Sequence, residues 1–187
     1  MRIIAGEYRG RSIKTGKGPG YRPATGKVRE ALFSMLESMG VFWPDMRVLD
    51  LFAGSGSLGL EALSRGAKKS FFVEQELNAA RLLLENIKNL GISEKRAELR
   101  RQNALCFLNK QPELGFDLIF IDPPYGLNML QKALPKVIEH SWLLKEGLLC
   151  AEVEGSLLFR ADDRHELEMI KDKKFGQTRI LLWKRVN

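Results

Sequence analysis

The 187-residue sequence is poor in the residues that build disulfides and metal centres, with two cysteines and two histidines. Cys106 and Cys150 stand alone, without the Cys-x-x-Cys spacing of zinc ligands or redox pairs. His140 and His165 also lack partners at ligand spacing. We therefore expect neither a disulfide framework nor a metal site.

Long hydrophobic runs are also absent. No apolar stretch approaches the roughly 20 residues that cross a bilayer, and residues 1–6 lack the apolar core of a signal peptide. Hydrophobic residues make up 44% of the chain, which is ordinary for a globular protein. The sequence predicts one domain over residues 1–187, monomeric, without membrane contact and in the reducing cytoplasm.

The positive charge is concentrated at one end of the chain. The formal net charge is +7, and residues 1–29 account for all of it, because Glu7 is the only acid there. A basic block joined to a neutral domain is typical of a polyanion binder, whereas a solvated arm is the alternative. The candidate RNA-binding residues are Arg2, Arg9, Arg11, Lys14, Arg22, Lys27 and Arg29.

The order of strand-like and helix-like segments predicts the fold class. We expect a basic β-hairpin arm over residues 1–20, built around two glycines, and then a helix over 28–39. Strands are expected at 47–52, 70–74, 98–101, 116–121, 147–153, 165–170 and 178–184, and further helices at 58–65, 77–90, 104–109 and 129–139. This alternation predicts an α/β domain with a doubly wound, mainly parallel sheet. The lysines between residues 171 and 174 are expected in a solvated turn.

A glycine-rich segment follows the strand expected at 47–52. Gly54, Gly56 and Gly59 have the Gly-x-Gly-x-x-Gly spacing of dinucleotide-binding loops, where glycine lets a ligand approach the backbone closely. The spacing alone discriminates poorly between cofactors, but Asp50 stands where it could hold a ligand ammonium. Ligands bind at the carboxyl ends of parallel strands. Six residues should therefore converge there: Asp50, Gly54, Gly56, Glu74, Asn103 and Asp122.

A second motif, Asp122-Pro123-Pro124-Tyr125, follows the buried strand expected at 116–121. The prolines fix φ near about −65° and stiffen the turn, an ionised Asp122 only accepts hydrogen bonds, and Tyr125 offers a flat face. The carboxylate of Asp122 and a backbone carbonyl of the turn are two hydrogen-bond acceptors. Placed beside a stacking surface, they suit an exocyclic amine on a planar base or amide. A simple type I turn is the alternative.

Together the two motifs resemble those of class I S-adenosylmethionine-dependent methyltransferases that act on an amino nitrogen. Further segments resemble the RsmD family more narrowly: RIIAG (2–6), RGR (9–11), RP (22–23), VREALF (28–33), LGLEALSRG (58–66) and FGQT (175–178). The resemblance implies a Rossmann-like, seven-stranded fold and S-adenosylmethionine as cofactor. It also implies methyl transfer to N2 of one guanine in 16S ribosomal RNA, within a small ribosomal subunit or its assembly intermediate.

The resemblance implies roles for individual residues as well. The cofactor-binding residues would be Asp50, Phe52, Ala53, Gly54, Ser55, Gly56, Glu74, Asn103 and Ala104. Glu74 would bind the ribose hydroxyls, while Asn103 and Ala104 border the adenine. The catalytic residues would be Asp122, Pro123, Pro124 and Tyr125. Hydrogen bonds from the amine to Asp122 and to the Pro123 carbonyl would aim its lone pair at the methyl group, with Tyr125 stacking on the guanine.

The sequence departs from the family at three positions and leaves other readings open. Gly26 stands where the family usually has Asp, which affects any cofactor contact from that loop, and Glu76 and Asn103 stand where Asp is common. Within the class, the alternatives are methylation of protein glutamine N5 or DNA adenine N6. The basic segment and Asp122 disfavour methylation of protein glutamine. The short chain disfavours methylation of DNA adenine, because it leaves little room for a target-recognition domain. A non-catalytic RNA-binding protein and a nicotinamide oxidoreductase are the alternatives outside it.

Overall fold

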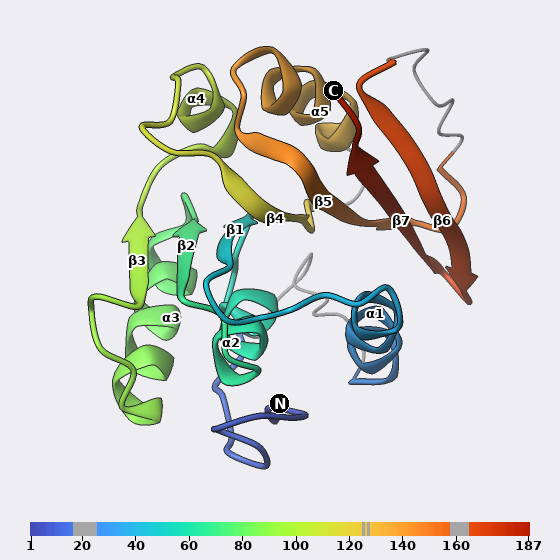
Figure 1. Ribbon diagram of the computed structural model, residues 1–187. Helices are drawn as coiled ribbons and strands as arrows, with labels where there is room; N and C mark the ends of the chain where they lie inside the picture. Colours follow the sequence, from blue (N-terminus) through green and yellow to red (C-terminus); the bar gives the residue numbers. More distant parts are fainter. Residues whose placement is uncertain (17–25, 125, 127, 158–164) are drawn as a thin grey trace.

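The computed structural model describes residues 1–16, 26–124, 126, 128–157 and 165–187. It has three layers, because helices cover both faces of a central sheet (Figure 1). The helices are α1 (Gly26–Ser38), α2 (Ser57–Ser64), α3 (Leu77–Leu90), α4 (Ala104–Leu108) and α5 (Met129–Glu139). The strands are β1 (Arg47–Leu51), β2 (Lys69–Val73), β3 (Ala97–Arg100), β4 (Phe116–Ile121), β5 (Leu143–Glu154), β6 (Leu167–Phe175) and β7 (Thr178–Arg185).

The seven strands form one sheet in the order β3-β2-β1-β4-β5-β7-β6. The first five strands of this order are mutually parallel, and β7 runs antiparallel to both β5 and β6. The central strand β4 has the sequence FDLIFI and is buried at every position except Asp117, as expected for a strand covered on both faces. The predicted doubly wound, mainly parallel, seven-stranded sheet is therefore confirmed.

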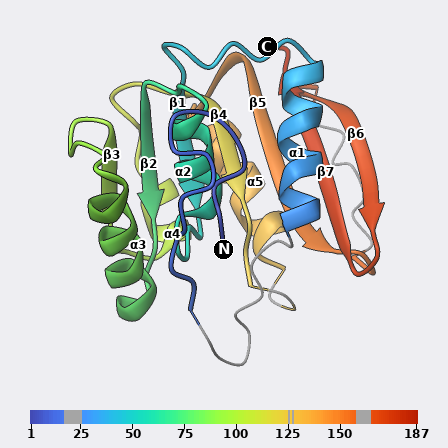
Figure 2. The ribbon, with the colours of Figure 1, turned by 90° about the horizontal axis from the view of Figure 1, so that it is seen from below.

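The helices divide between the two faces of the sheet. Figures 1 and 2 show α4 and α5 on one face and α1, α2 and α3 on the other. Each face has its own apolar core, the first packed around Leu134 and Trp142 and the second around Phe33 and Leu58. Within the described ranges, no helix combines the length and apolar character needed to cross a bilayer.

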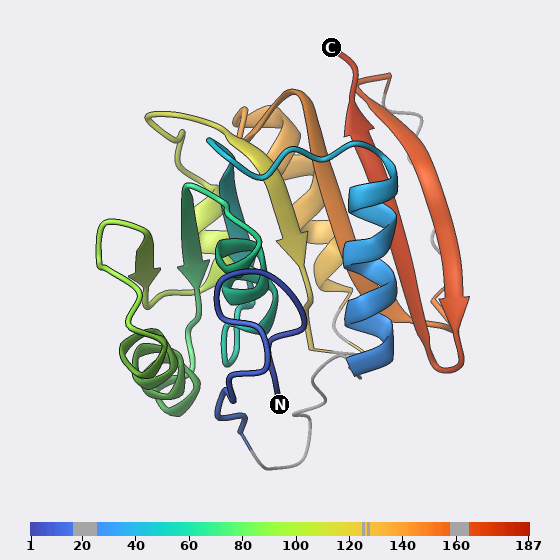
Figure 3. The same cartoon turned by 60° about the horizontal axis from the view of Figure 1, so that its bottom comes forward.

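The N-terminal segment, residues 1–16, packs against the α2–α3 side of the domain (Figure 3). The chain folds back on itself as the predicted hairpin requires, but only Arg2 and Ser12 form an antiparallel bridge. Ile3, Tyr8 and Ile13 are buried in the same cluster as residues of α2 and α3. The arm is therefore a packed loop rather than a projecting two-stranded hairpin, and its residues 17–20 lie outside the described part of the chain.

Two polar side chains of α2 hold this segment in place. The buried carboxylate of Glu61 accepts the backbone N–H groups of Ile4 and Ala5, at 2.8 and 3.0 Å. The Ser64 hydroxyl accepts the N–H of Tyr8 at 3.0 Å. Buried polar groups are stable only when their hydrogen bonds are made, so α2 and the segment form one packed unit.

The antiparallel edge of the sheet differs most from the sequence prediction. The strand expected at 165–170 is β6, which begins at Leu167 and continues to Phe175. Lys171, Lys173 and Lys174 therefore lie in a strand, and the predicted solvated turn is wrong. Among the described strands, β6 is at the edge of the sheet and pairs with β7 alone. Its lysines are exposed to solvent, and lysine on an edge strand discourages pairing with other chains.

Candidate functional site

The glycine loop between β1 and α2 lies at the carboxyl edge of the parallel strands and is bound to the end of β2. The N–H of Ala53 donates to the Val73 carbonyl at 3.0 Å, and the N–H of Gly54 donates to the Glu74 carboxylate at 2.8 Å. Gly56 adopts φ +82° at the start of α2. A side chain there would strain the backbone, and its Cβ would lie 2.3 Å from Leu83. Glycine is thus required where the loop turns into the helix.

Asp50 lies beneath this loop and is 1% exposed. Its carboxyl group accepts the N–H of Gly59 at 2.9 Å. Burial raises the pKa of Asp50 to about 8, and the negative charge of Glu74 adds to this, although the Gly59 hydrogen bond opposes it. A buried acid of this kind is stabilised as a carboxylate by a cation, so Asp50 suits a ligand that carries an ammonium group.

This raised pKa predicts how stability depends on pH. Between the ordinary pKa of an aspartate and about 8, the folded protein holds a proton on Asp50 that the unfolded chain has lost. The free energy of unfolding therefore falls as pH rises through that window. We expect Asp50→Asn to remove this component, making the variant more stable than the wild type at the alkaline end by a few kcal/mol.

Chemical denaturation of the cofactor-free proteins at several pH values measures this difference. Asp45→Asn is the matched control, because the Asp45 side chain is 87% exposed. Parallel pH–stability curves for the wild type and Asp50→Asn would contradict the prediction.

The ends of β2 and β3 supply the next group of polar residues. Glu74 follows β2, and its carboxylate also accepts the N–H of Glu76 at 2.7 Å. Asn103 caps α4 by accepting the N–H of Cys106 at 3.1 Å, and its amide donates to the Gln75 side chain at 2.9 Å. Ala104 is buried at the first position of α4. These contacts place Glu74, Asn103 and Ala104 at the same edge as the glycine loop.

The Asp122–Pro124 turn leaves β4 directly beside β1. The N–H of Asp122 points to the carbonyl of Leu51 at 3.5 Å. Desolvation raises the pKa of Asp122 well above its usual range, and the charges of Glu152 and Asp50 raise it further. Pro123 is buried and Pro124 is exposed. Tyr125, the expected stacking residue, lies outside the described residues.

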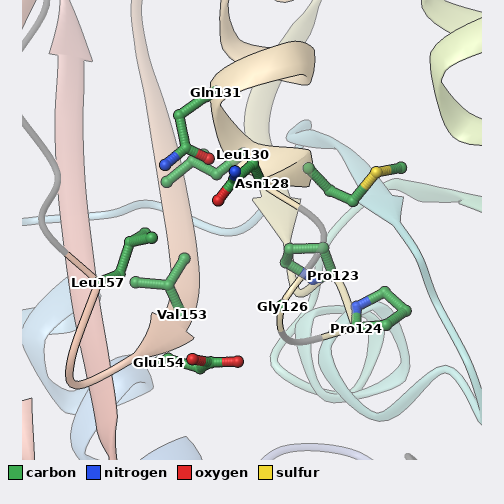
Figure 4. A pocket seen from close by; sticks show the side chains of 10 residues that line it. Pro123, Pro124, Gly126, Asn128, Leu130, Gln131, Val153, Glu154 and Leu157 are labelled. Atoms are coloured by element: carbon green, nitrogen blue, oxygen red, sulfur yellow. The ribbon is translucent and has the colours of Figure 1, made fainter.

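A hollow opens to solvent beside this turn, and the space within it, open solvent included, is about 370 Å³ (Figure 4). The two prolines form one side, the end of β5 and the residues after it form another, and the start of α5 closes the third. Among the described residues, the hollow is lined by Pro123, Pro124, Gly126, Asn128, Met129, Leu130, Gln131, Val153, Glu154 and Leu157. Its mostly apolar wall with a few polar groups at the rim suits a planar, partly polar molecule.

The predicted RNA-binding residues do not form a single class. Arg2, Arg9, Arg11, Lys14 and Lys27 are exposed, although Arg11 also donates to the Leu90 carbonyl at 2.8 Å and Lys14 pairs with Glu85 at 2.8 Å. Arg22 lies outside the described residues. Arg29 is 1% exposed, with its guanidinium against the Arg2 carbonyl and the Met1 sulfur. The structure therefore contradicts the prediction for Arg29, which fixes α1 to the N-terminal segment.

Three residues near the site were missed by the sequence reasoning. Glu61 and Ser64 hold the N-terminal segment, and Asn86 joins it to the glycine loop. The Asn86 side chain accepts the N–H of Lys14 at 2.7 Å and donates to the carbonyls of Lys14 and Ser55 at 2.9 and 3.0 Å. The sequence signal for Asn86 was its place as a polar residue within the buried apolar face of α3, beside Leu83, Ile87 and Leu90.

The strand order, the glycine loop after β1 and the Asp-Pro-Pro turn after β4 define a class I methyltransferase. The family model described as "Conserved hypothetical protein 95" matches residues 1–184. The chain belongs to this family, the RsmD family.

Similar proteins cover nearly the same length. A "Putative rRNA methyltransferase YlbH" from Bacillus subtilis is 36% identical over 187 residues, which is 99% of each chain. A "Ribosomal RNA small subunit methyltransferase D" from Haemophilus influenzae is 41% identical over 82% of this chain and 79% of its own. Among solved structures, a "Putative methyltransferase yhhF" from Escherichia coli has a TM-score of 0.87 at 32% identity, covering 100% of this chain and 98% of that one.

Proposed function

We propose that the protein transfers a methyl group from S-adenosylmethionine to the exocyclic N2 of a guanine in 16S ribosomal RNA. The observation that carries the proposal is the position of the Asp122–Pro124 turn, which follows the strand beside β1 and its glycine loop and whose two prolines line a hollow suited to a planar base. Relatives that bear the name ribosomal RNA small subunit methyltransferase D support the choice of RNA.

The residues present fit this cofactor by their chemistry. Asp50 offers a buried carboxyl group to the ammonium of the methionine part, beneath the backbone of Gly54 and Gly56. Phe52, Ala53 and Ser55 complete that loop. Glu74 suits a pair of ribose hydroxyls, because a carboxylate has two oxygens that can each accept a hydrogen bond. Asn103 and Ala104 border the place for the adenine.

The chain's own part in the reaction is binding and orientation. When bound, the cofactor supplies an electrophilic methyl group on a sulfonium. Asp122 and the Pro123 carbonyl accept hydrogen bonds from the guanine amine, which localises a lone pair that is otherwise delocalised into the ring. Tyr125 stacks on the base. Holding two reactants in line contributes up to about 7–11 kcal/mol to lowering the barrier, and no covalent intermediate with the protein is needed.

Recognition of the RNA begins with its phosphates. The exposed Arg2, Arg9, Arg11, Lys14 and Lys27 supply the positive charge, and affinity for phosphates falls with salt and carries no base specificity. The target guanine then leaves its stack to enter the pocket. We propose a cytoplasmic monomer acting on the small ribosomal subunit or its assembly intermediate.

Transfer of tritiated methyl groups tests this function. Small subunits lacking the modification, and naked 16S ribosomal RNA, are incubated with the protein and labelled cofactor, and the nucleosides are then separated. We expect the label in N2-methylguanosine. Label in methyladenosine or in ribosomal protein would overturn the guanine assignment. Comparison of the two substrates shows whether the assembled particle is required.

A further inference from the structure

Three carboxyl groups lie on one face of three adjacent strands of the sheet. In the register of β1, β4 and β5, Asp50 is level with Phe120, and Phe120 is level with Cys150. Asp122 and Glu152 each follow two residues later. Since alternate residues of a strand point to the same face, Asp50, Asp122 and Glu152 all face the side covered by α1 and α2.

Asp122 and Glu152 are neighbours across this face. Ile121 of β4 pairs with Ala151 of β5, so the next residues of the two parallel strands stand side by side, and adjacent strands are about 4.8 Å apart. Glu152 is 4% exposed. A charged acid buried beside a second acid has a cost in folding stability.

The charges on this face are coupled. After desolvation, the charge of Glu152 is the largest contribution that raises the pKa of Asp122, and Asp50 adds to it. Burial and then the charges of Glu152 and Asp122 raise the pKa of the Cys150 thiol. Glu152 also interacts with other groups of the protein. On β7 the residue paired with it is Ile180, and the buried guanidinium of Arg29 on α1 contacts the N-terminal segment.

We propose that Glu152 acts through Asp122, giving Asp122 the proton affinity it needs to receive the proton that leaves the guanine amine during methyl transfer. The proposal rests on the proposed function and adds a positioning residue to it. Glu152 belongs to β5 rather than to the turn after β4, and its role needs no contact with either reactant.

The amine nitrogen forms a bond to the methyl carbon, while the bond between that carbon and sulfur breaks and leaves its electron pair on sulfur. The nitrogen, now positively charged, loses a proton to an Asp122 oxygen. The cation of the bound sulfonium favours ionised Asp122 before transfer. Once sulfur is neutral, the neighbouring Glu152 charge favours protonated Asp122.

Glu152→Gln tests the proposal, because it removes the charge and keeps the shape. In single-turnover methyl transfer to undermethylated small subunits, we expect the rate at neutral pH to fall about tenfold. We also expect the acidic limb of the pH–rate profile to move about one pH unit lower, because Asp122 loses its charged neighbour. A merely structural Glu152 would not move that limb. Glu146→Gln, at the exposed start of the same strand and paired with Lys184, should match the wild type.

Infrared titration of the cofactor-free protein tests the same coupling without activity. The carbonyl stretch of protonated Asp122, identified by its loss in Asp122→Asn and distinguished from Asp50 by Asp50→Asn, should persist in the wild type above the pH range in which an ordinary aspartate titrates. In Glu152→Gln it should disappear at lower pH. An Asp122 titration in the ordinary aspartate range in the wild type, or one unmoved by Glu152→Gln, would overturn the proposal.

The two failures are distinguishable. If the protein methylates guanine and Glu152→Gln keeps the wild-type pH profile, the role of Glu152 is wrong and the proposed function stands. If no methyl group reaches RNA, the proposed function fails, and the proton-acceptor role that rests on it fails as well, whatever the infrared titration shows about the charge coupling.

Discussion

Replacing Asp122 by alanine is expected to slow methyl transfer about 10³-fold while leaving the affinity for S-adenosylmethionine within a few fold of the wild type. The variant loses both the acceptor that orients the amine and the group that takes its proton. The Pro123 carbonyl remains, so some positioning survives. The methyl-transfer rate of Asp122→Asn should lie between the rates of the wild type and Asp122→Ala, because the asparagine amide oxygen still accepts a hydrogen bond but takes up no proton.

Single-turnover transfer of tritiated methyl groups measures the rate, and calorimetry measures cofactor affinity. Asp45→Asn is the control, since Asp45 precedes β1 at the opposite end of the sheet from the glycine loop. An Asp122→Ala protein that binds the cofactor and transfers methyl groups at nearly the wild-type rate would refute the assignment of the turn.

Replacing Gly6 by alanine is expected to detach the N-terminal segment from α2. Gly6 has φ +82°, and a Cβ there would lie 1.8 Å from the Ser64 carbonyl oxygen and 2.7 Å from the Arg65 nitrogen. These are backbone atoms of a buried helix, so the loop must move. This movement of the N-terminal segment away from α2 breaks the hydrogen bond that the Glu7 N–H donates to the Ser64 carbonyl, which is 2.7 Å long. We expect a loss of about 3 kcal/mol of stability and about tenfold weaker RNA binding.

Gly10→Ala is a close control for this change. Gly10 has nearly the same conformation, φ +80°, but no atom lies within 4 Å of a Cβ built there. Gly10→Ala therefore measures the cost of backbone strain alone, about 1 kcal/mol, without the steric collision that Gly6→Ala also causes. Denaturation and filter binding at several salt concentrations compare the two variants. Equal behaviour of Gly6→Ala and Gly10→Ala would show that the contact with α2 does not hold the segment.

The parallel half of the fold could be predicted because its sequence patterns are strong. β4 and the helices α3 and α5 have the predicted bounds, since a six-residue segment with five apolar residues and two strongly amphipathic stretches allow few other structures. The meeting of Asp50, Glu74 and Asp122 at one edge follows from a rule of topology, which requires only the order of the strands.

The remaining features depend on tertiary context that no local pattern contains. β6 was misjudged because its Lys171–Lys174 stretch has the composition of a turn, and only pairing with β7 makes it a strand. Arg29 was predicted to bind RNA because it belongs to the basic block of residues 1–29, yet it is buried and donates to the backbone of a segment 27 residues earlier. The bonds from Glu61 to Ile4 and Ala5 span more than 50 residues of sequence and leave no local trace.

The hydrogen bonds of Asn86 have a consequence for target choice. One side chain fastens Lys14, at the end of the basic segment, and Ser55, in the glycine loop. The surface proposed for RNA phosphates and the loop proposed for the methyl donor thus cannot shift independently. Under that function the active site reaches only a guanine that lies at a fixed distance from the RNA phosphates bound by the basic segment. Particle architecture, rather than neighbouring base sequence, would then decide which guanine is methylated.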